Sequence, residues 1–186
     1  MTPPTLRRTA LLCLSLLLPA CEGPCPSPPT FVDVVGLHVI PYNRTAVVLG
    51  NNPAVRAADL QMRLELVERL YSASPPRRGG FAAWADCIPP TPTYTDQADS
   101  VRVTSRYDYD AQHPAGTSLN DIVRFSYGTP LPDVIQRPQP VQTFTRQSLV
   151  FTVPPARAGT QQFQVRLHLV NGEVHQGSTP AFTLQP

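Results

Sequence analysis

The chain has 186 residues, of which 41% are hydrophobic and only 15% are charged. All 15 basic residues are arginine, they face 13 acidic residues, and the formal net charge is +2. A chain so close to neutral gives no electrostatic case for binding nucleic acid, which needs clustered positive charge. The 23 prolines argue against long helices and favour short strands joined by loops.

The N-terminal segment has the pattern of an export signal. Arg7 and Arg8 form a short basic region, and residues 9–18 form an apolar run of the length found in signal peptides. This run is about half as long as a membrane-spanning helix, which needs roughly 20 residues. The sequence therefore predicts a signal peptide over residues 1–20 and no transmembrane helix.

This signal ends in Leu18-Pro-Ala-Cys21, which resembles the lipobox of bacterial lipoproteins, although Pro19 departs from the usual residues at its position. In such proteins the cysteine becomes the lipid-bearing N-terminus. Two acyl chains anchor a protein stably, because each buried CH₂ contributes about 0.8 kcal/mol. The resemblance implies lipidation of Cys21 and a Pro-rich spacer over residues 21–30. The alternative is ordinary cleavage that leaves Cys21 and Cys25 for disulfides.

Cys25 and Cys87 remain as an even pair if Cys13 leaves with the signal peptide and Cys21 carries lipid. An even pair in an oxidising compartment predicts a disulfide between the two. Closing a loop of this length contributes about 4 kcal/mol in the chain-entropy model. Free thiols, or a bond to another protein, are the alternatives.

The first half of the mature chain contains two predicted strands. Residues 31–40 are apolar in both alternating sets, which indicates a strand buried on both faces, and a turn is expected over residues 41–44. Residues 59–71 are good helix formers, yet leucine and methionine alternate with polar residues through them, so a strand is favoured over a helix. Trp84 lies close to Cys87, and we assign it to the core in preference to a ligand platform.

The middle of the chain begins with another alternating stretch. Residues 100–109 place Tyr107 and Tyr109 on the same face as Val101 and Val103, so both tyrosines are expected in the core. Residues 110–146 are polar and rich in proline, with one helical turn expected over residues 119–126 and capped by Asn120.

The last forty residues carry the clearest pattern. Residues 148–153 and 163–169 alternate as strands, and Asn171-Gly172 predicts a two-residue type I′ hairpin followed by a return strand over residues 174–184. Short strands with polar faces and turn signals are typical of β-sandwiches. We therefore expect an all-β, immunoglobulin-like sandwich as a single domain over residues 31–186.

The order of these features resembles small, uncharacterised lipoproteins of Bacteroidota-type bacteria, a domain family of unknown function. The shared features are a second cysteine close behind the lipobox, an apolar strand with a glycine at residues 31–40, an Ala-rich segment ending at Cys87, an Asn-Asp segment before Phe125, the Pro-Pro, Gly159 and Phe163 that follow, and a final Asn-Gly hairpin. The resemblance implies no activity, cofactor or catalytic residue.

The predicted hairpin suggests one metal site. A two-residue loop pairs His168 with His175, with Cβ atoms roughly 5 Å apart, and places Glu173 on the same face. Two imidazoles and a carboxylate can hold zinc or copper, whereas the ordinary alternative is a solvated polar pair. The acidic pair Asp108 and Asp110 does not continue as a calcium-binding EF-hand loop, because the required residues do not follow it.

Sequence motifs of common enzymes are absent from the chain, including Gly-x-Ser-x-Gly, His-Glu-x-x-His and phosphate-binding glycine loops. We therefore expect a non-enzymatic lipoprotein of the cell envelope without a cofactor. The outer membrane is the favoured location, with the domain in the periplasm or at the cell surface. The expected role is structural or protein-interacting, and the alternative is binding of carbohydrate or a small ligand by loops at one end of the sandwich. Envelope proteins or glycans are the expected partners, together with the membrane through the lipid.

Overall fold

The computed structural model describes residues 29–44, 46–47, 53–72, 91–131 and 135–186. Within them nearly every regular element is a β-strand, apart from the 3-10 turn η1 (Ala57–Asp59) and the short helix α2 (Gln142–Thr145). The expected all-β class is therefore confirmed. The predicted signal peptide, together with Cys21, Cys25, Trp84 and Cys87, lies outside the described residues.

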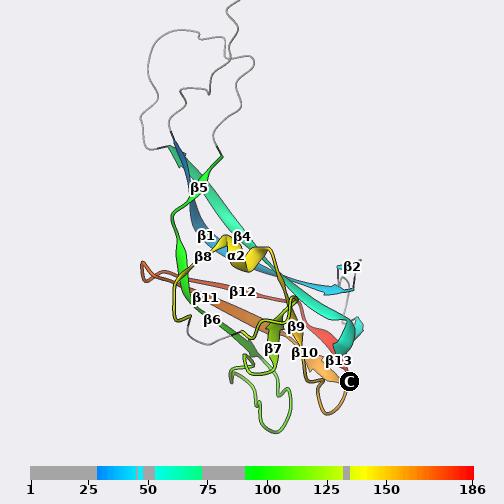
Figure 1. Cartoon of the computed structure of the whole chain (residues 1–186). Coiled ribbons are helices and arrows are strands. Elements are labelled where there is room, and N and C mark those ends of the chain that lie inside the picture. The colour runs from blue at the N-terminus through cyan, green and yellow to red at the C-terminus, as the bar shows by residue number, and fades with distance from the viewer. Residues whose placement is uncertain (1–28, 45, 48–52, 73–90, 132–134) are drawn as a thin grey trace, which may run out of the picture. The chain divides into compact units, whose positions relative to one another are not determined.

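The described strands form three sheets (Figure 1). The first has the order β2 (Ala46–Val47), β1 (Thr30–Asn43), β4 (Leu60–Ser72), β9 (Ser148–Phe151), β7 (Val123–Phe125), with β5 (Thr93–Tyr94) also beside β1. The second has the order β12 (Val174–Ser178), β11 (Phe163–Leu169), β6 (Gln97–Ser105), β8 (Gln139–Pro140). The third has the order β10 (Gly159–Gln161), β13 (Phe182–Gln185), β3 (Ala54–Arg56).

Phe31–Tyr71 and Pro92–Pro186 form one compact unit, and residues 73–90 lie outside the described part of the chain. A single domain spanning all of residues 31–186 therefore stays a prediction.

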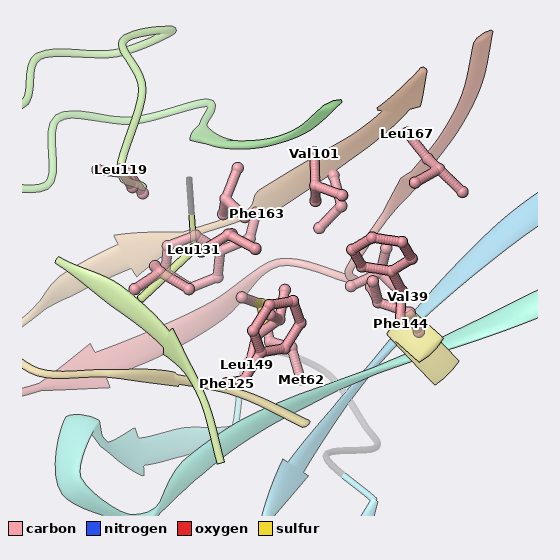
Figure 2. Packing of buried hydrophobic residues seen from close by; sticks show 14 of the residues in the cluster. Val39, Met62, Val101, Leu119, Phe125, Leu131, Phe144, Leu149, Phe163 and Leu167 are labelled. Atoms are coloured by element: carbon pink, nitrogen blue, oxygen red, sulfur yellow. The ribbon is translucent and has the colours of Figure 1, made fainter. Parts of the chain in front are cut away.

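Buried side chains from all three sheets form one hydrophobic core. Figure 2 shows Met62 of β4 and Leu149 of β9 near Phe163 of β11, with Phe144 of α2 in the same cluster. The alternation predicted for β11 is confirmed, because Phe163, Val165, Leu167 and Leu169 are all fully buried. Each such side chain contributes roughly 1.5–3 kcal/mol relative to an exposed one.

The strand predicted over residues 59–71 is confirmed as β4. Leu60, Met62 and Leu64 are fully buried and alternate with more exposed neighbours, as the period of two requires. Met62 pairs with Leu149 of the antiparallel strand β9. The apolar period therefore outweighed the helix propensity of this segment.

The prediction for β1 needs correction. Val34 and Leu37 are both buried, so the inward-facing set changes parity between them, and Val35 is 45% exposed. Each half of the strand therefore buries one face only, and the change of the buried face between the halves resembles a β-bulge. Gly36 lies at this point, where an added Cβ would sit 3.3 Å from Val67 of β4. The strand also continues to Asn43, so the turn expected over residues 41–44 begins only at Arg44.

The segment after β6 also differs from expectation. β6 ends at Ser105, and the expected helical turn over residues 119–126 is instead a β-turn followed by β7. Asn120 is buried and does not cap a helix. Its Oδ1 accepts a hydrogen bond from the Val103 amide at 2.8 Å, and its Nδ2 donates to the Val101 carbonyl at 2.6 Å. The side-chain amide thus hydrogen-bonds the edge of β6, as a neighbouring strand would.

The register of the β11–β12 hairpin differs most from the prediction. His168 pairs with Val174 and Leu167 pairs with His175, which shifts the expected register by one residue. The reason is a three-residue loop, closed by a 2.9 Å hydrogen bond from the Gly172 amide to the Leu169 carbonyl, with only Gly172 at positive φ. This is the geometry of a turn with a glycine bulge.

The predicted return strand over residues 174–184 is also divided in two. β12 pairs with β11 in the second sheet, and β13 pairs with β10 and β3 in the third.

Candidate functional site

Two loops meet at one end of the fold and form a cleft. The loop after β6, residues 106–122, and the loop after β9, residues 152–158, lie close together in the lower part of the picture (Figure 1). The cleft has a volume of about 720 Å³. Its lining includes Tyr107, Asp108, Asp110, Arg157, Thr160 and Gln161. A cavity of this size suits a small polar ligand.

A buried histidine supports the first loop. His113 Nδ1 lies 2.8 Å from Asp110 Oδ1, and Nε2 lies 3.0 Å from Asp121 Oδ2. The same oxygen of Asp110 accepts hydrogen bonds from the backbone amides of Gln112 and His113, each at 2.8 Å. The imidazole therefore ties two separate points of the loop together.

The electrostatics favour a charged His113. Burial alone would lower the pKa of His113, but the hydrogen bonds and charges of Asp121 and Asp110 outweigh it, and the pKa is raised. Burial likewise pushes the pKa of Asp110 upward, but the side chain and backbone amide of His113 and the amide of Gln112 lower it overall. The two groups thus stabilise each other's charged forms.

The floor of the cleft is fixed by bonds from the core. The Ser105 hydroxyl donates to Gln161 Oε1 at 2.5 Å, and Gln161 Nε2 donates to the Asp108 carbonyl at 2.9 Å. The Tyr109 hydroxyl donates to the Val153 carbonyl of the second loop at 2.5 Å. Burial raises the pKa of Tyr109, so the phenol keeps its proton and stays a donor at neutral pH. Both loops are thereby positioned before any ligand arrives.

Tyr107 and Tyr109 have different surroundings. Tyr109 is buried, as predicted, and stacks on Phe151 with ring centroids 5.4 Å apart. Tyr107 was also expected in the core, but β6 ends before it and its side chain is 39% exposed at the cleft. An exposed aromatic ring next to carboxylates and a guanidinium can stack on a ligand and leave its polar groups to the charged neighbours.

The acidic residues of the loop serve its structure. Asp108 Oδ1 accepts a hydrogen bond from the Ala115 amide at 2.8 Å, and Asp110 holds His113. Asp110 and Asp121 face different nitrogens of the His113 ring, so they do not converge on an ion. In the described part of the chain, no three His, Cys, Asp or Glu side chains gather as a metal site.

The predicted metal ligands on the hairpin are separated by the register shift. His168 Nδ1 faces Asp99 Oδ1 at 2.7 Å, whereas His175 is largely buried and lies 3.8 Å from Glu173 Oε2. Because paired residues share a face, His175 is on the side of buried Leu167 and His168 is on the opposite side. The two imidazoles and Glu173 therefore do not form the expected arrangement.

Sequence reasoning missed His113 and Gln161, which support the cleft, and it assigned Asn120 to a helix cap instead of a bond to β6. The signals available were polar residues within otherwise apolar or turn-forming segments, such as Asn120 between Leu119 and Ile122. Such residues are buried only when they find hydrogen-bond partners. The partners of Asn120 and Gln161 are distant in sequence, whereas those of His113 lie in its own loop.

No family model, no curated protein and no solved structure matches this chain. The resemblance to envelope lipoproteins therefore stays a prediction, as do lipidation of Cys21 and the bond between Cys25 and Cys87. Among the residues that the structure describes, no helix is long and apolar enough to cross a membrane.

Proposed function

We propose that this chain is a lipid-anchored binding module of the cell envelope, built on an immunoglobulin-like β-sandwich. Antiparallel strands in two larger sheets that contribute to one core support the sandwich. A structural or protein-interacting role and a ligand-binding role both fit such a scaffold. The cleft between the end loops favours the second role, with a carbohydrate or another small polar molecule as the ligand.

The observation that carries this proposal is the organisation of the cleft before binding. Its loops are held by partly buried hydrogen bonds of His113, Tyr109 and Gln161, so a ligand need not order them and little conformational entropy is lost. Tyr107 offers a ring face, while Arg157 offers a charged group at the lining. A sugar presents apolar C–H faces and hydroxyls, which match those two kinds of group.

The anchor forms the second part of the proposal. Lipid on Cys21, and a disulfide from Cys25 to Cys87, would leave only a few residues between the bilayer and the folded domain. Mass spectrometry of the mature protein should find a diacylated Cys21, and Cys21→Ser should move the protein from the membrane to the soluble fraction. An unmodified Cys21, or a bond between Cys21 and Cys25, would contradict the anchor.

The cleft is tested with the full chain purified in detergent and applied to a glycan array. We expect retention of a glycan by the natural chain and at least about tenfold weaker retention by Tyr107→Ala, because stacking on an aromatic ring is lost. Tyr127→Ala is the matched control, since Tyr127 is 84% exposed and lies outside the cleft. Equal retention by both variants would contradict the site.

A pull-down from envelope extract separates the two roles. If no glycan is retained and one envelope protein binds the natural chain and Tyr107→Ala equally, the protein-interaction role replaces the ligand-binding role.

A further inference from the structure

Two arginines face each other on the outer side of the second sheet. Arg102 of β6 is paired directly with Arg166 of β11, and both side chains are exposed. Like charges directly opposite each other on antiparallel strands destabilise the pairing. Within the described part of the chain, neither guanidinium has a hydrogen bond or an ion pair. The fold therefore brings two positive charges together, and the described residues supply no counter-charge for either.

A cleft of about 400 Å³ lies over this pair and is lined by Ser100, Arg102, Ser118, Arg166 and His168. On the same face of the sheet, the next pair of facing residues along the two strands is Ser100 and His168. Asp99, whose carboxylate lies beside this cleft, faces His168 Nδ1 at 2.7 Å. Among the described residues that line the cleft, the charged groups left to a ligand are therefore the two guanidiniums.

The inner side of the same strands explains why the fold tolerates this repulsion. Val101 and Val103 of β6 pair with Leu167 and Val165 of β11, and all four side chains are fully buried. Their burial outweighs one repulsive pair at the surface. The guanidiniums are therefore carried by strands that the core holds in place.

We propose that this cleft binds a phosphate monoester group between Arg102 and Arg166. Such a group carries a charge of about −1.5 to −2 at neutral pH, which balances two guanidiniums, whereas a carboxylate would balance only one. Guanidinium presents paired N–H donors that match phosphate oxygens. Free phosphate, a phosphorylated sugar and a phospholipid headgroup share this chemistry. The site is separate from the end cleft and does not depend on its ligand.

The test is calorimetric titration of the full chain in detergent with inorganic phosphate at low salt. We expect saturable binding that weakens at least about tenfold in Arg102→Gln and in Arg166→Gln, because each loses charge-assisted hydrogen bonds. Arg124→Gln is the matched control, since it removes an equal charge from an exposed position on β7 of the first sheet. Absence of saturable binding, or equal weakening in the control, would overturn the proposal.

Further titrations identify the source of the phosphate. Tighter binding of short-chain phosphatidic acid than of glycerol phosphate or inorganic phosphate supports a lipid headgroup, and the reverse order supports a soluble ligand. Acetate binding as tightly as phosphate contradicts the charge argument. Tyr107→Ala should keep full phosphate binding, so that loss of the glycan site and loss of the phosphate site are distinguishable.

Discussion

The end loops and the outer face of the β6–β11 pair both carry charged side chains, but they use them differently. In the loops, His113 and Asp110 are largely buried and bonded to each other. On the sheet face, Arg102 and Arg166 are exposed and have no partner among the described residues. The bonded polar groups of the loops stabilise the fold, whereas the exposed arginines of the sheet face remain for a ligand. Substitutions in the two regions should therefore change stability in opposite directions.

The largest change in the free energy of unfolding is expected near the end of the loop after β6. Asn120→Ala should destabilise the fold by about 3 kcal/mol, because the Val103 amide and the Val101 carbonyl lose their buried partner. Asn171→Ala is the control, since Asn171 is exposed and its side chain bonds, within the described ranges, with Glu173 alone. Urea denaturation measures both. Equal losses in the two variants would mean that the buried amide adds nothing.

His113→Ala should cost about 2 kcal/mol near pH 6, because two bonds of a buried group are lost. The pKa of His113 is raised on folding, so its contribution is complete below about pH 6.5 and is lost as the pH rises through the folded pKa. The lowered pKa of Asp110 gives stability above about pH 4 that is lost as the pH falls.

The difference in unfolding free energy between the natural chain and His113→Ala should therefore be largest between about pH 4 and 6.5. Urea denaturation across this range measures it. Asn171→Ala, which removes no ionisable group from an exposed position, is the control and should show no such window. A difference that grew steadily above pH 7 would contradict the charged pair.

On the sheet face the sign should reverse. Arg102→Gln should stabilise the protein by about 0.5 kcal/mol in phosphate-free, low-salt buffer, because repulsion from Arg166 is removed. The gain should disappear at high salt, which screens exposed charges. A destabilised variant would show that Arg102 has a structural partner and would break the contrast between the two regions.

The smallest effect is expected from zinc. Because His168 and His175 lie on opposite sides of the hairpin, stoichiometric Zn²⁺ should leave the melting temperature unchanged in the natural chain and in His168→Ala. A rise that His168→Ala abolishes would restore the metal site first suggested by the sequence.

Strands with long apolar alternation could be predicted from the sequence, and particular residues show why. In β11 every second side chain enters the core, and in β4 the same period outweighed helix propensity. The β11–β12 register could not be predicted, because Asn171-Gly172 suits either a two-residue or a three-residue loop. Of these two residues only Gly172 adopts positive φ, which fits the longer loop.

The cleft itself was less predictable. Residues 106–122 have no apolar period, and their conformation depends on bonds to distant residues, such as Tyr109 to Val153 and Asp108 to Gln161. The arginine pair depends on which residues of β6 and β11 face each other. Local patterns carry no information about either arrangement, because both are set by tertiary contacts.

The central claim is that the fold leaves unpaired the polar groups that its ligand uses. Melting of the natural chain and of Arg102→Gln, each with and without phosphate at low salt, tests it most directly. We predict that Arg102→Gln melts higher than the natural chain without phosphate, and that phosphate raises the natural chain's melting temperature clearly more than that of the variant. If phosphate shifts both proteins equally, or neither, the claim is contradicted.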